Sequence, residues 1–178
     1  MSVVADVASR VAAAIRDVPN FPKPGIVFKD ITPVLLDATL FREATEAMAA
    51  PFAAQDISHV VAIESRGFIL GGPVAQTLGA AFVPFRKPGK LPHIVERIEY
   101  ALEYGVDALE CHRDALRGGQ RVLVVDDVLA TGGTAVAACA LVESLGAAVQ
   151  GCSFLVELEF LNGRAKLGER RIERVVRY

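Results

Sequence analysis

The stretch that decides the fold is VLVVDDVLATGGT, which runs from Val122 to Thr134. Its first four residues are apolar and predict a buried strand. Two adjacent carboxylates, Asp126 and Asp127, follow, and the segment from Thr131 then leads into an apolar helix. Glycines let backbone amides close on an anion, and the first amides of a helix are unpaired and lie at its positive end. The stretch therefore predicts a strand, a phosphate-binding loop and a helix in succession.

The kind of phosphate loop is narrowed by two motifs that the chain lacks. It has no GxxxxGK[ST] and no GxGxxG segment, which excludes a Walker-type nucleotide loop and the dinucleotide fingerprint. Carboxylates repel phosphate, so Asp126 and Asp127 are predicted to hold the vicinal hydroxyls of a sugar beside a 5′-phosphate. The alternative is purely structural, a strand that ends in an acidic turn before a glycine-rich helix start.

Outward from this stretch, further apolar strands alternate with helices. Strands are predicted over 59–63, 81–83 and 149–158, and helices over 67–78 and 135–145. This alternation predicts an α/β fold with a mainly parallel sheet flanked by helices. Ligands on such sheets lie at the carboxyl ends of the strands, so the residues that follow Ile63, Val83 and Val125 are candidates for the site.

The N-terminal part is predicted to be a helix followed by a covering arm. Apolar residues recur at helical spacing from Val7 to Val18, which predicts an amphipathic helix that ends before Pro19. The proline-rich segment 21–25 cannot hold regular structure, so an ordered arm is expected to reach Pro33. A further helix is predicted to begin after Asp37, which is a plausible N-cap.

The composition places the chain among folded globular proteins. It has 178 residues, with 19 Lys and Arg against 21 Asp and Glu, 52% hydrophobic residues and a mean hydropathy of +0.38. These values exclude a disordered chain, and a net charge of −2 gives no global attraction to nucleic acid or to a membrane surface. A single domain is the default at this length. The basic tail over 164–177 is predicted to be a solvated face.

A membrane span and a metal centre are also considered. The run from Gly67 to Phe85 is uncharged and about long enough to cross a bilayer, but Pro73 and Pro84 favour a helix followed by a buried strand. Charged residues near the N-terminus argue against a signal peptide, so a cytoplasmic location is expected. The 3 cysteines and 3 histidines show no metal-ligand spacing, and no protein-held metal is predicted.

The stretch from Val122 to Thr134 resembles the phosphoribosyl-diphosphate-binding signature of the type I phosphoribosyltransferases. Within that family, the segment FPKPGIVFKDITPVL over 21–35 is similar to the N-terminal arm of the adenine phosphoribosyltransferases. ESRGF over 64–68 resembles their diphosphate-contacting turn, RKPGKLP over 86–92 their basic loop, and YALEYG over 100–105 their mobile catalytic loop. The likeness covers almost the whole chain.

The resemblance implies one phosphoribosyltransferase domain over 1–178. Residues 1–35 would form the N-terminal helix and the base-binding arm or hood, and residues 86–105 a flexible catalytic loop. Two departures from the family pattern are visible. Ser65 stands where alanine is more usual, and the segment 93–99 is particular to this chain.

The resemblance also implies roles for individual residues. Glu103 would be catalytic and move a proton at N7 of adenine, and adenine would be bound by Val27, Phe28, Lys29 and Leu129. Phosphoribosyl diphosphate or AMP would be bound by Arg66, Arg86, Lys87, Lys90, Tyr104, Asp126, Asp127, Ala130, Thr131, Gly132, Gly133 and Thr134. The residue types agree, because cations that follow a predicted strand suit a diphosphate. An exposed solubility patch is the alternative for the basic loop, and a core aromatic is the alternative for Phe28.

The activity implied by the resemblance is transfer of the 5-phosphoribosyl group from phosphoribosyl diphosphate to N9 of adenine, which gives AMP and diphosphate in purine salvage. Mg²⁺ would be bound chiefly through phosphoribosyl diphosphate, and the protein would be a homodimer without nucleic-acid or membrane partners. The alternatives are transfer to a 6-oxo purine or to orotate, and a non-catalytic regulator that binds phosphoribosyl diphosphate.

Overall fold

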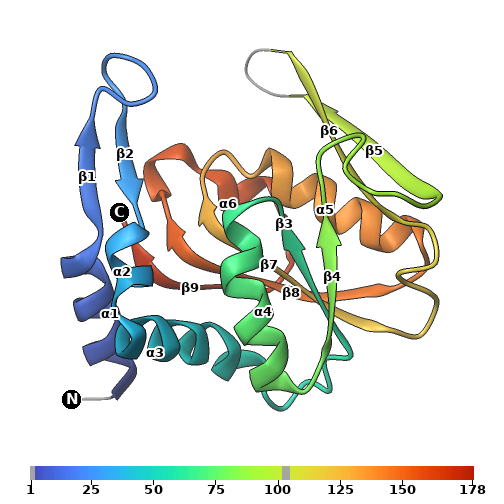
Figure 1. The fold of residues 1–178 in the computed structure, drawn as a ribbon, viewed down its shortest axis with the longest axis horizontal. Coiled ribbons are helices and arrows are strands. Elements are labelled where there is room, and N and C mark those ends of the chain that lie inside the picture. The colour runs from blue at the N-terminus through green and yellow to red at the C-terminus, as the bar shows by residue number, and fades with distance from the viewer. Residues whose placement is uncertain (1–2, 102–104) are drawn as a thin grey trace.

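The computed structural model describes residues 3–101 and 105–178, and a parallel sheet lies at its centre (Figure 1). The sheet has five strands in the order β4-β3-β7-β8-β9, and all neighbouring pairs are parallel. The strands are β3 (His59–Ile63), β4 (Ala81–Phe85), β7 (Arg121–Leu129), β8 (Ala148–Glu157) and β9 (Ile172–Arg177). The α/β fold class predicted from the alternation of strands and helices is confirmed.

Helices cover both faces of this sheet. The helical segments are α1 (Val3–Ala14), α2 (Thr32–Leu36), α3 (Ala38–Ala49), η1 (Ala50–Phe52), α4 (Arg66–Leu78), α5 (Gly133–Ser144), η2 (Glu159–Leu161) and α6 (Gly163–Lys166). Helices α1, α3 and α4 pack with Leu123 and Val125 on one face, and α5 packs with Val122 and Val124 on the other. Because both faces of β7 are buried over 122–125, the sequence there is continuously apolar rather than alternating.

Two predictions made from local pattern are confirmed. The side chain of Asp37 caps α3 by accepting hydrogen bonds from the amides of Thr39 and Leu40, both at 3.0 Å. The uncharged run from Gly67 to Phe85 forms most of α4 and then β4. None of the helices in the described part of the chain combines the length and the apolar character that crossing a bilayer requires.

The predicted N-terminal helix is too long, because α1 ends at Ala14. Residues Arg16–Pro19 form strand β1, which pairs antiparallel with β2 (Val27–Asp30), so that Val18 lies opposite Phe28. A residue that precedes proline is disfavoured in a helix and favoured in extended backbone, which explains the change of structure before Pro19. The arm is therefore a two-stranded hairpin.

The predicted loop over 86–105 is also partly a strand. Residues Val95–Ala101 form β5, which pairs antiparallel with β6 (Val106–His112). Arg97 and Glu99 are exposed, whereas Ile98 and Tyr100 pack against the core, which is the period of two that a half-buried strand shows. Figure 1 shows the β1–β2 hairpin and the β5–β6 hairpin rising on the same side of the sheet.

The prediction that 164–177 is a solvated face is wrong for most of that segment. Strand β9 pairs with β8 at the edge of the sheet, and its Ile172 and Val176 are buried. Arg164 forms a bidentate ion pair with the buried carboxylate of Glu157. The arginines of this tail obscured a strand whose apolar residues, Ile172, Val175 and Val176, lie between them.

Helix α4 packs on β3 through a close contact at Gly71, so a side chain at this position should destabilise the fold. A Cβ on Gly71 would lie 2.5 Å from Cβ of Ala62 and 3.2 Å from Phe82, whereas one on Gly118 would have the Gly146 carbonyl oxygen at 3.8 Å. Gly71→Ala should lower the free energy of unfolding by about 1 to 3 kcal/mol through overpacking. Gly118→Ala, the control, should change it by less than about 1 kcal/mol, because its Cβ would make only an ordinary van der Waals contact. Equal denaturation midpoints for the two variants would contradict this packing.

Candidate functional site

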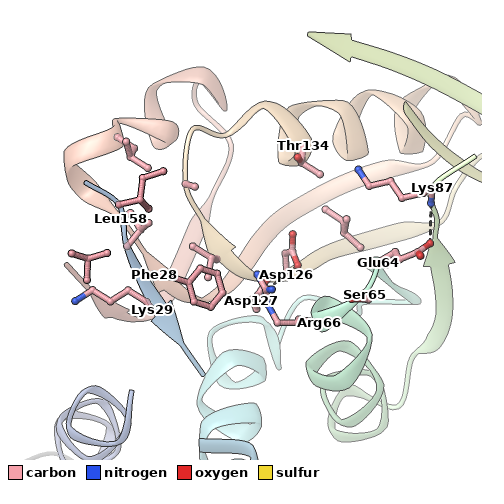
Figure 2. Close-up of a pocket in the computed structure, with 16 residues that line it drawn as sticks. Phe28, Lys29, Glu64, Ser65, Arg66, Lys87, Asp126, Asp127, Thr134 and Leu158 are labelled. Atoms are coloured by element: carbon pink, nitrogen blue, oxygen red, sulfur yellow. Dashed lines mark hydrogen bonds and ion pairs between the residues drawn. The ribbon is translucent and has the colours of Figure 1, made fainter. Parts of the chain in front are cut away.

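A cavity of about 470 Å³ opens at the carboxyl ends of β3 and β7, beneath the β1–β2 arm. Figure 2 shows its labelled side chains converging from the arm, the start of α4 and the end of β7. The residues that line it are Ile26, Val27, Phe28, Lys29, Ile63, Glu64, Ser65, Arg66, Lys87, Asp126, Asp127, Val128, Ala130, Thr134, Leu158 and Leu161. The cavity therefore lies where parallel sheets place their ligands.

A smaller cavity of about 80 Å³ adjoins the first and is formed by the glycine-rich loop. Its lining comprises Asp126, Phe154 and the continuous segment 128–135. Gly132 has a φ of +80°, a left-handed conformation that favours glycine, and α5 begins at the next residue. The first amides of a helix have no partner within the helix and lie at its positive end. The shape, the amides and the dipole together suit one phosphate group.

The adjacent carboxylates lie on β7 itself rather than beyond its end, because the strand continues to Leu129. Asp127 is buried and forms an ion pair with Arg66, while Oδ1 of Asp126 accepts a hydrogen bond of 2.9 Å from the Asp127 amide. Burial and the neighbouring Asp127 carboxylate raise the pKa of Asp126 well above its ordinary value. The two carboxylates thus differ: one has a guanidinium partner and the other favours its proton.

Arg66 connects the acidic pair with the arm. Its guanidinium carbon lies 5.3 Å from the ring centroid of Phe28, within cation–π range, while its Nε pairs with Asp127. Figure 2 shows Arg66 extending from the start of α4 towards Asp127 and Phe28. One cation therefore contacts both the aromatic face and the carboxylate that the sequence analysis gave to base and sugar.

The basic loop after β4 is held by Glu64. Its Oε2 accepts a hydrogen bond of 2.9 Å from the Lys87 amide and one of 3.2 Å from Nε of Arg86. Burial would raise the pKa of Glu64, but these bonds outweigh it and the pKa is lowered. Among the predicted cations of the loop, Lys87 lines the main cavity, whereas Arg86 pairs with Glu64 and donates at 3.1 Å to the Lys90 carbonyl.

Lys87 also belongs to a polar network that local sequence reasoning missed. Its Nζ forms an ion pair with Asp107 and a 3.0 Å hydrogen bond with the Tyr100 hydroxyl, which donates to Asp107 at 3.1 Å. Thr134 Oγ1 donates to the same hydroxyl at 3.4 Å. Burial would lower the pKa of Lys87, but Asp107 and Tyr100 outweigh it and the pKa is raised. The network joins the β5–β6 hairpin to the glycine-rich loop.

The apolar end of the cavity contains the predicted adenine residues Val27, Phe28 and Lys29, and Leu129 lines the smaller cavity. Leu158 and Leu161 also line the main cavity, although the sequence analysis gave them no role. A signal was available for Leu158, which directly follows β8 and so lies at the carboxyl end of a strand.

The predicted residues are unevenly distributed over the two cavities. Arg66, Lys87, Asp126, Asp127 and the loop from Ala130 to Thr134 come together. Arg86 and Lys90 lie on the adjacent loop without lining either cavity. Glu103 and Tyr104 lie outside the described residues.

Replacing Asp126 by Asn should change how stability depends on pH. The raised pKa means that the folded chain binds this proton more tightly than the unfolded chain does. The stabilisation is complete below the ordinary aspartate pKa of about 3.9 and is lost as the pH rises through the raised value. Asparagine has no such proton to lose, so the melting temperature of Asp126→Asn should gain on the wild type as the pH rises above about 4.

The control for this prediction is Asp114→Asn, since Asp114 is exposed in a turn. Its melting temperature should follow that of the wild type over the same pH range. A difference between Asp126→Asn and the wild type that stays constant with pH would contradict the raised pKa.

Comparisons with known proteins agree on one family. The model of the phosphoribosyl transferase domain matches residues 37–172. The adenine phosphoribosyltransferase of Myxococcus xanthus is 57% identical over 173 residues, which cover 96% of this chain and 91% of that relative.

Solved structures give the same result. The adenine phosphoribosyltransferase of Rhodothermus marinus has a TM-score of 0.93 at 52% identity, covering 98% of this chain and 99% of the other. The Saccharomyces cerevisiae adenine phosphoribosyltransferase, solved with an imino-altritol bisphosphate and adenine, has a TM-score of 0.90 at 39% identity, covering 96% and 99%. Because the family model and these relatives span most of the chain, and the cavity carries the expected loop and acidic pair, the chain belongs to the adenine phosphoribosyltransferase family.

Proposed function

We propose that the chain transfers the 5-phosphoribosyl group of phosphoribosyl diphosphate to N9 of adenine, releasing diphosphate and forming AMP. The observation that carries this proposal is the union, in one cavity system, of a phosphate-sized loop, two adjacent carboxylates and an apolar arm. These three parts match the 5′-phosphate, the ribose hydroxyls and the base of AMP. Membership of the adenine phosphoribosyltransferase family supports the same activity.

The polar residues would position the sugar phosphate. The loop from Thr131 to Thr134 would bind the 5′-phosphate through its amides and hydroxyls, and Asp126 and Asp127 would accept hydrogen bonds from the ribose hydroxyls. Lys87 and Arg66 would stabilise the diphosphate that leaves the anomeric carbon. Both cations are paired with carboxylates, Asp107 and Asp127, so the incoming anion would replace one partner of each. Catalysis then depends mainly on positioning and on stabilising the leaving group's charge.

Adenine would be recognised by backbone groups of the arm. Strand β2 belongs to a two-stranded sheet, so its second edge has no strand partner among the described elements. Residues two apart on a strand direct their amide and carbonyl groups to the same edge, which gives Val27 and Lys29 a common orientation. A carbonyl there can accept from the exocyclic amine while an amide donates to N1. A 6-oxo purine would leave the carbonyl and the amide mispaired. Phe28 is the proposed stacking residue for adenine.

Glu103 is the proposed proton acceptor. As N9 of adenine forms its bond to the anomeric carbon, the base loses a proton from N7, and a carboxylate on the catalytic loop is a suitable acceptor. The support for this role is the YALEYG segment of the sequence, in which Tyr104 is a further proposed contact of phosphoribosyl diphosphate or AMP.

Mg²⁺ is the proposed cofactor, bound chiefly through phosphoribosyl diphosphate. Within residues 3–101 and 105–178, no group of three or more His, Cys, Asp or Glu side chains could hold a metal ion. The adjacent carboxylates Asp126 and Asp127 nevertheless suit it, because Mg²⁺ commonly keeps several waters and binds through one or two carboxylates together with substrate phosphates. When bound, the ion would neutralise charge on the diphosphate, and these residues would hold its hydrated shell and the ribose.

A homodimer is proposed for the assembly, and the cytoplasm for the location. Support for the dimer comes from exposed apolar side chains near the β4 edge of the sheet, where Ile69 of α4 is 43% exposed and Phe82 of β4 is 39% exposed.

We also propose that residues 1–178 act as one domain, since α1 and β9 share the core cluster with the central strands.

The substrate prediction is tested with a panel of bases. With phosphoribosyl diphosphate and Mg²⁺, the protein should release diphosphate and form AMP from adenine, and should turn over hypoxanthine, guanine and orotate at least about a hundredfold more slowly, since mispaired polar groups cost kilocalories. Chromatography of the nucleotide product measures the rate with adenine and the rate with each of the other bases. Turnover of one of these other bases without turnover of adenine would overturn the choice of adenine.

The role of Glu103 is tested with a matched pair of variants. Glu103→Gln should lower kcat by about 10²- to 10⁴-fold, the usual range for loss of a general base. Glu99→Gln is the control, because Glu99 is close to Glu103 in the sequence and is an exposed residue of β5 that pairs with Arg97. Equal kcat values for the two variants would remove Glu103 from the mechanism. If Glu103→Ala and Asp127→Ala both turn over adenine as fast as an active wild-type protein does, the proposed mechanism is wrong.

A further inference from the structure

The glycine-rich loop rests directly on the backbone of a distant segment. A Cβ on Gly132 would lie 2.4 Å from the carbonyl oxygen of Gly163, and a Cβ on Gly163 would lie 2.1 Å from the carbonyl oxygen of Ala130. A side chain fits at neither position, so the two backbones are in direct contact. Gly163 opens α6 and is buried. The two loop residues that it contacts, Ala130 and Gly132, line the smaller cavity.

Arg164 holds Gly163 in this position. Its Nε and Nη2 donate to the two carboxylate oxygens of Glu157 at 2.8 Å and 2.7 Å, and its Nη1 donates to the carbonyl of Ile172 at 3.1 Å. These three bonds connect the residue next to Gly163 with two strands of the sheet. The segment therefore has little freedom to move away from the loop.

Glu157 is fixed in turn from both sides. It is the last residue of β8, lies opposite Leu129 of β7, is 3% exposed and has Nε of Arg174 at 3.0 Å from its Oε2. Hydrogen bonds from Arg164 lower its pKa, against the opposing effect of burial. The carboxylate is therefore charged at neutral pH and anchored to the strand next to the acidic pair.

Stability alone is a weak reason for this arrangement. Replacing a buried ion pair by well-packed apolar side chains is often neutral or stabilising. A bidentate arginine–carboxylate pair adds geometric specificity, because the two planar groups fix each other's orientation. The residue whose position it fixes, Gly163, contacts the loop that begins α5.

We propose that Glu157 and Arg164 are positioning residues for the phosphate loop, acting through the contact between Gly163 and Gly132. The inference rests on the proposed function, in which that loop binds the 5′-phosphate. The ion pair sets the position of Gly163, Gly163 sets the path from Ala130 to Gly132, and this path aims the first amides of α5. A displacement of about 1 Å at such a site can cost up to about a hundredfold in activity.

Two variants test this chain of contacts, each with a matched control. Arg164→Lys keeps the charge and removes the planar fork, while Gly163→Ala inserts a methyl group against Ala130. Arg170→Lys is the control for the first, because Arg170 forms a similar two-oxygen pair with Glu143 at the exposed end of α5. Gly118→Ala is the control for the second, because a Cβ there would make only an ordinary contact, 3.8 Å from the Gly146 carbonyl oxygen.

The readouts separate positioning from general loss of stability. Calorimetry with ribose 5-phosphate should show about tenfold weaker binding for Arg164→Lys and Gly163→Ala than for either control. The KM for phosphoribosyl diphosphate should rise by a similar factor in both variants, whereas the KM for adenine at saturating phosphoribosyl diphosphate should stay within about twofold. The melting temperature, measured in parallel, shows whether each variant is folded at the assay temperature.

The possible outcomes keep the two proposals apart. If the wild type binds ribose 5-phosphate and both variants bind it equally well, the positioning role is wrong while the proposed function stands. Equal rises in both KM values would also overturn it, because a merely structural lesion disturbs both substrates. A wild-type protein that binds no ribose 5-phosphate would overturn the proposed function and this inference with it.

Discussion

Two carboxylates side by side at the end of a buried strand are the constraint on which the rest of the structure depends. Asp126 and Asp127 lie on β7 between two other strands, where their mutual repulsion cannot be relieved by water alone. Two features reduce this repulsion: Arg66 pairs with Asp127, and the pKa of Asp126 is raised. Helix α4 begins at Arg66, so the packing of α4 against β3 is what delivers this cation.

The same balance extends through the whole site. Each of the three cations that line the main cavity, Lys29, Arg66 and Lys87, is held by an acid on another element. Glu64 in turn gathers the basic loop by accepting from its backbone and from Arg86. An anionic ligand can therefore enter without meeting unpaired buried charge, because it exchanges one counterion for another. This explains how a chain of net charge −2 can offer a site for a highly charged anion.

The sequence allowed the sheet and the phosphate loop to be predicted because both depend on local pattern. Apolar runs marked β3 and β7, β-branched and aromatic residues marked β8, and Gly132 marked the turn into α5. Strand ends were less predictable. The apolar pattern predicts a strand that ends at Val125, before Asp126 and Asp127, yet β7 continues through them because β8 pairs with it as far as Leu129.

The partners of charged residues could not be predicted, since they depend on topology. The pair of Lys87 with Asp107 arises because β5 and β6 pair antiparallel, and the pair of Glu157 with Arg164 because η2 and α6 turn the chain back towards β8. In the sequence alone, Arg164 is one basic residue of a basic tail. Its pairing is evident only once the buried carboxylate of Glu157 is seen beside it.

The strand order has a consequence for how the chain folds. Strand β7, which carries the acidic pair, pairs on one side with β3, from which more than fifty residues separate it, and on the other with β8. The arm, α4 and the glycine-rich loop likewise come from distant parts of the sequence. Contacts with large sequence separation carry the greatest loop-closure entropy and slow folding. We therefore expect the binding cavity to be among the last parts of the molecule to form during synthesis, after the helices and after each separate hairpin.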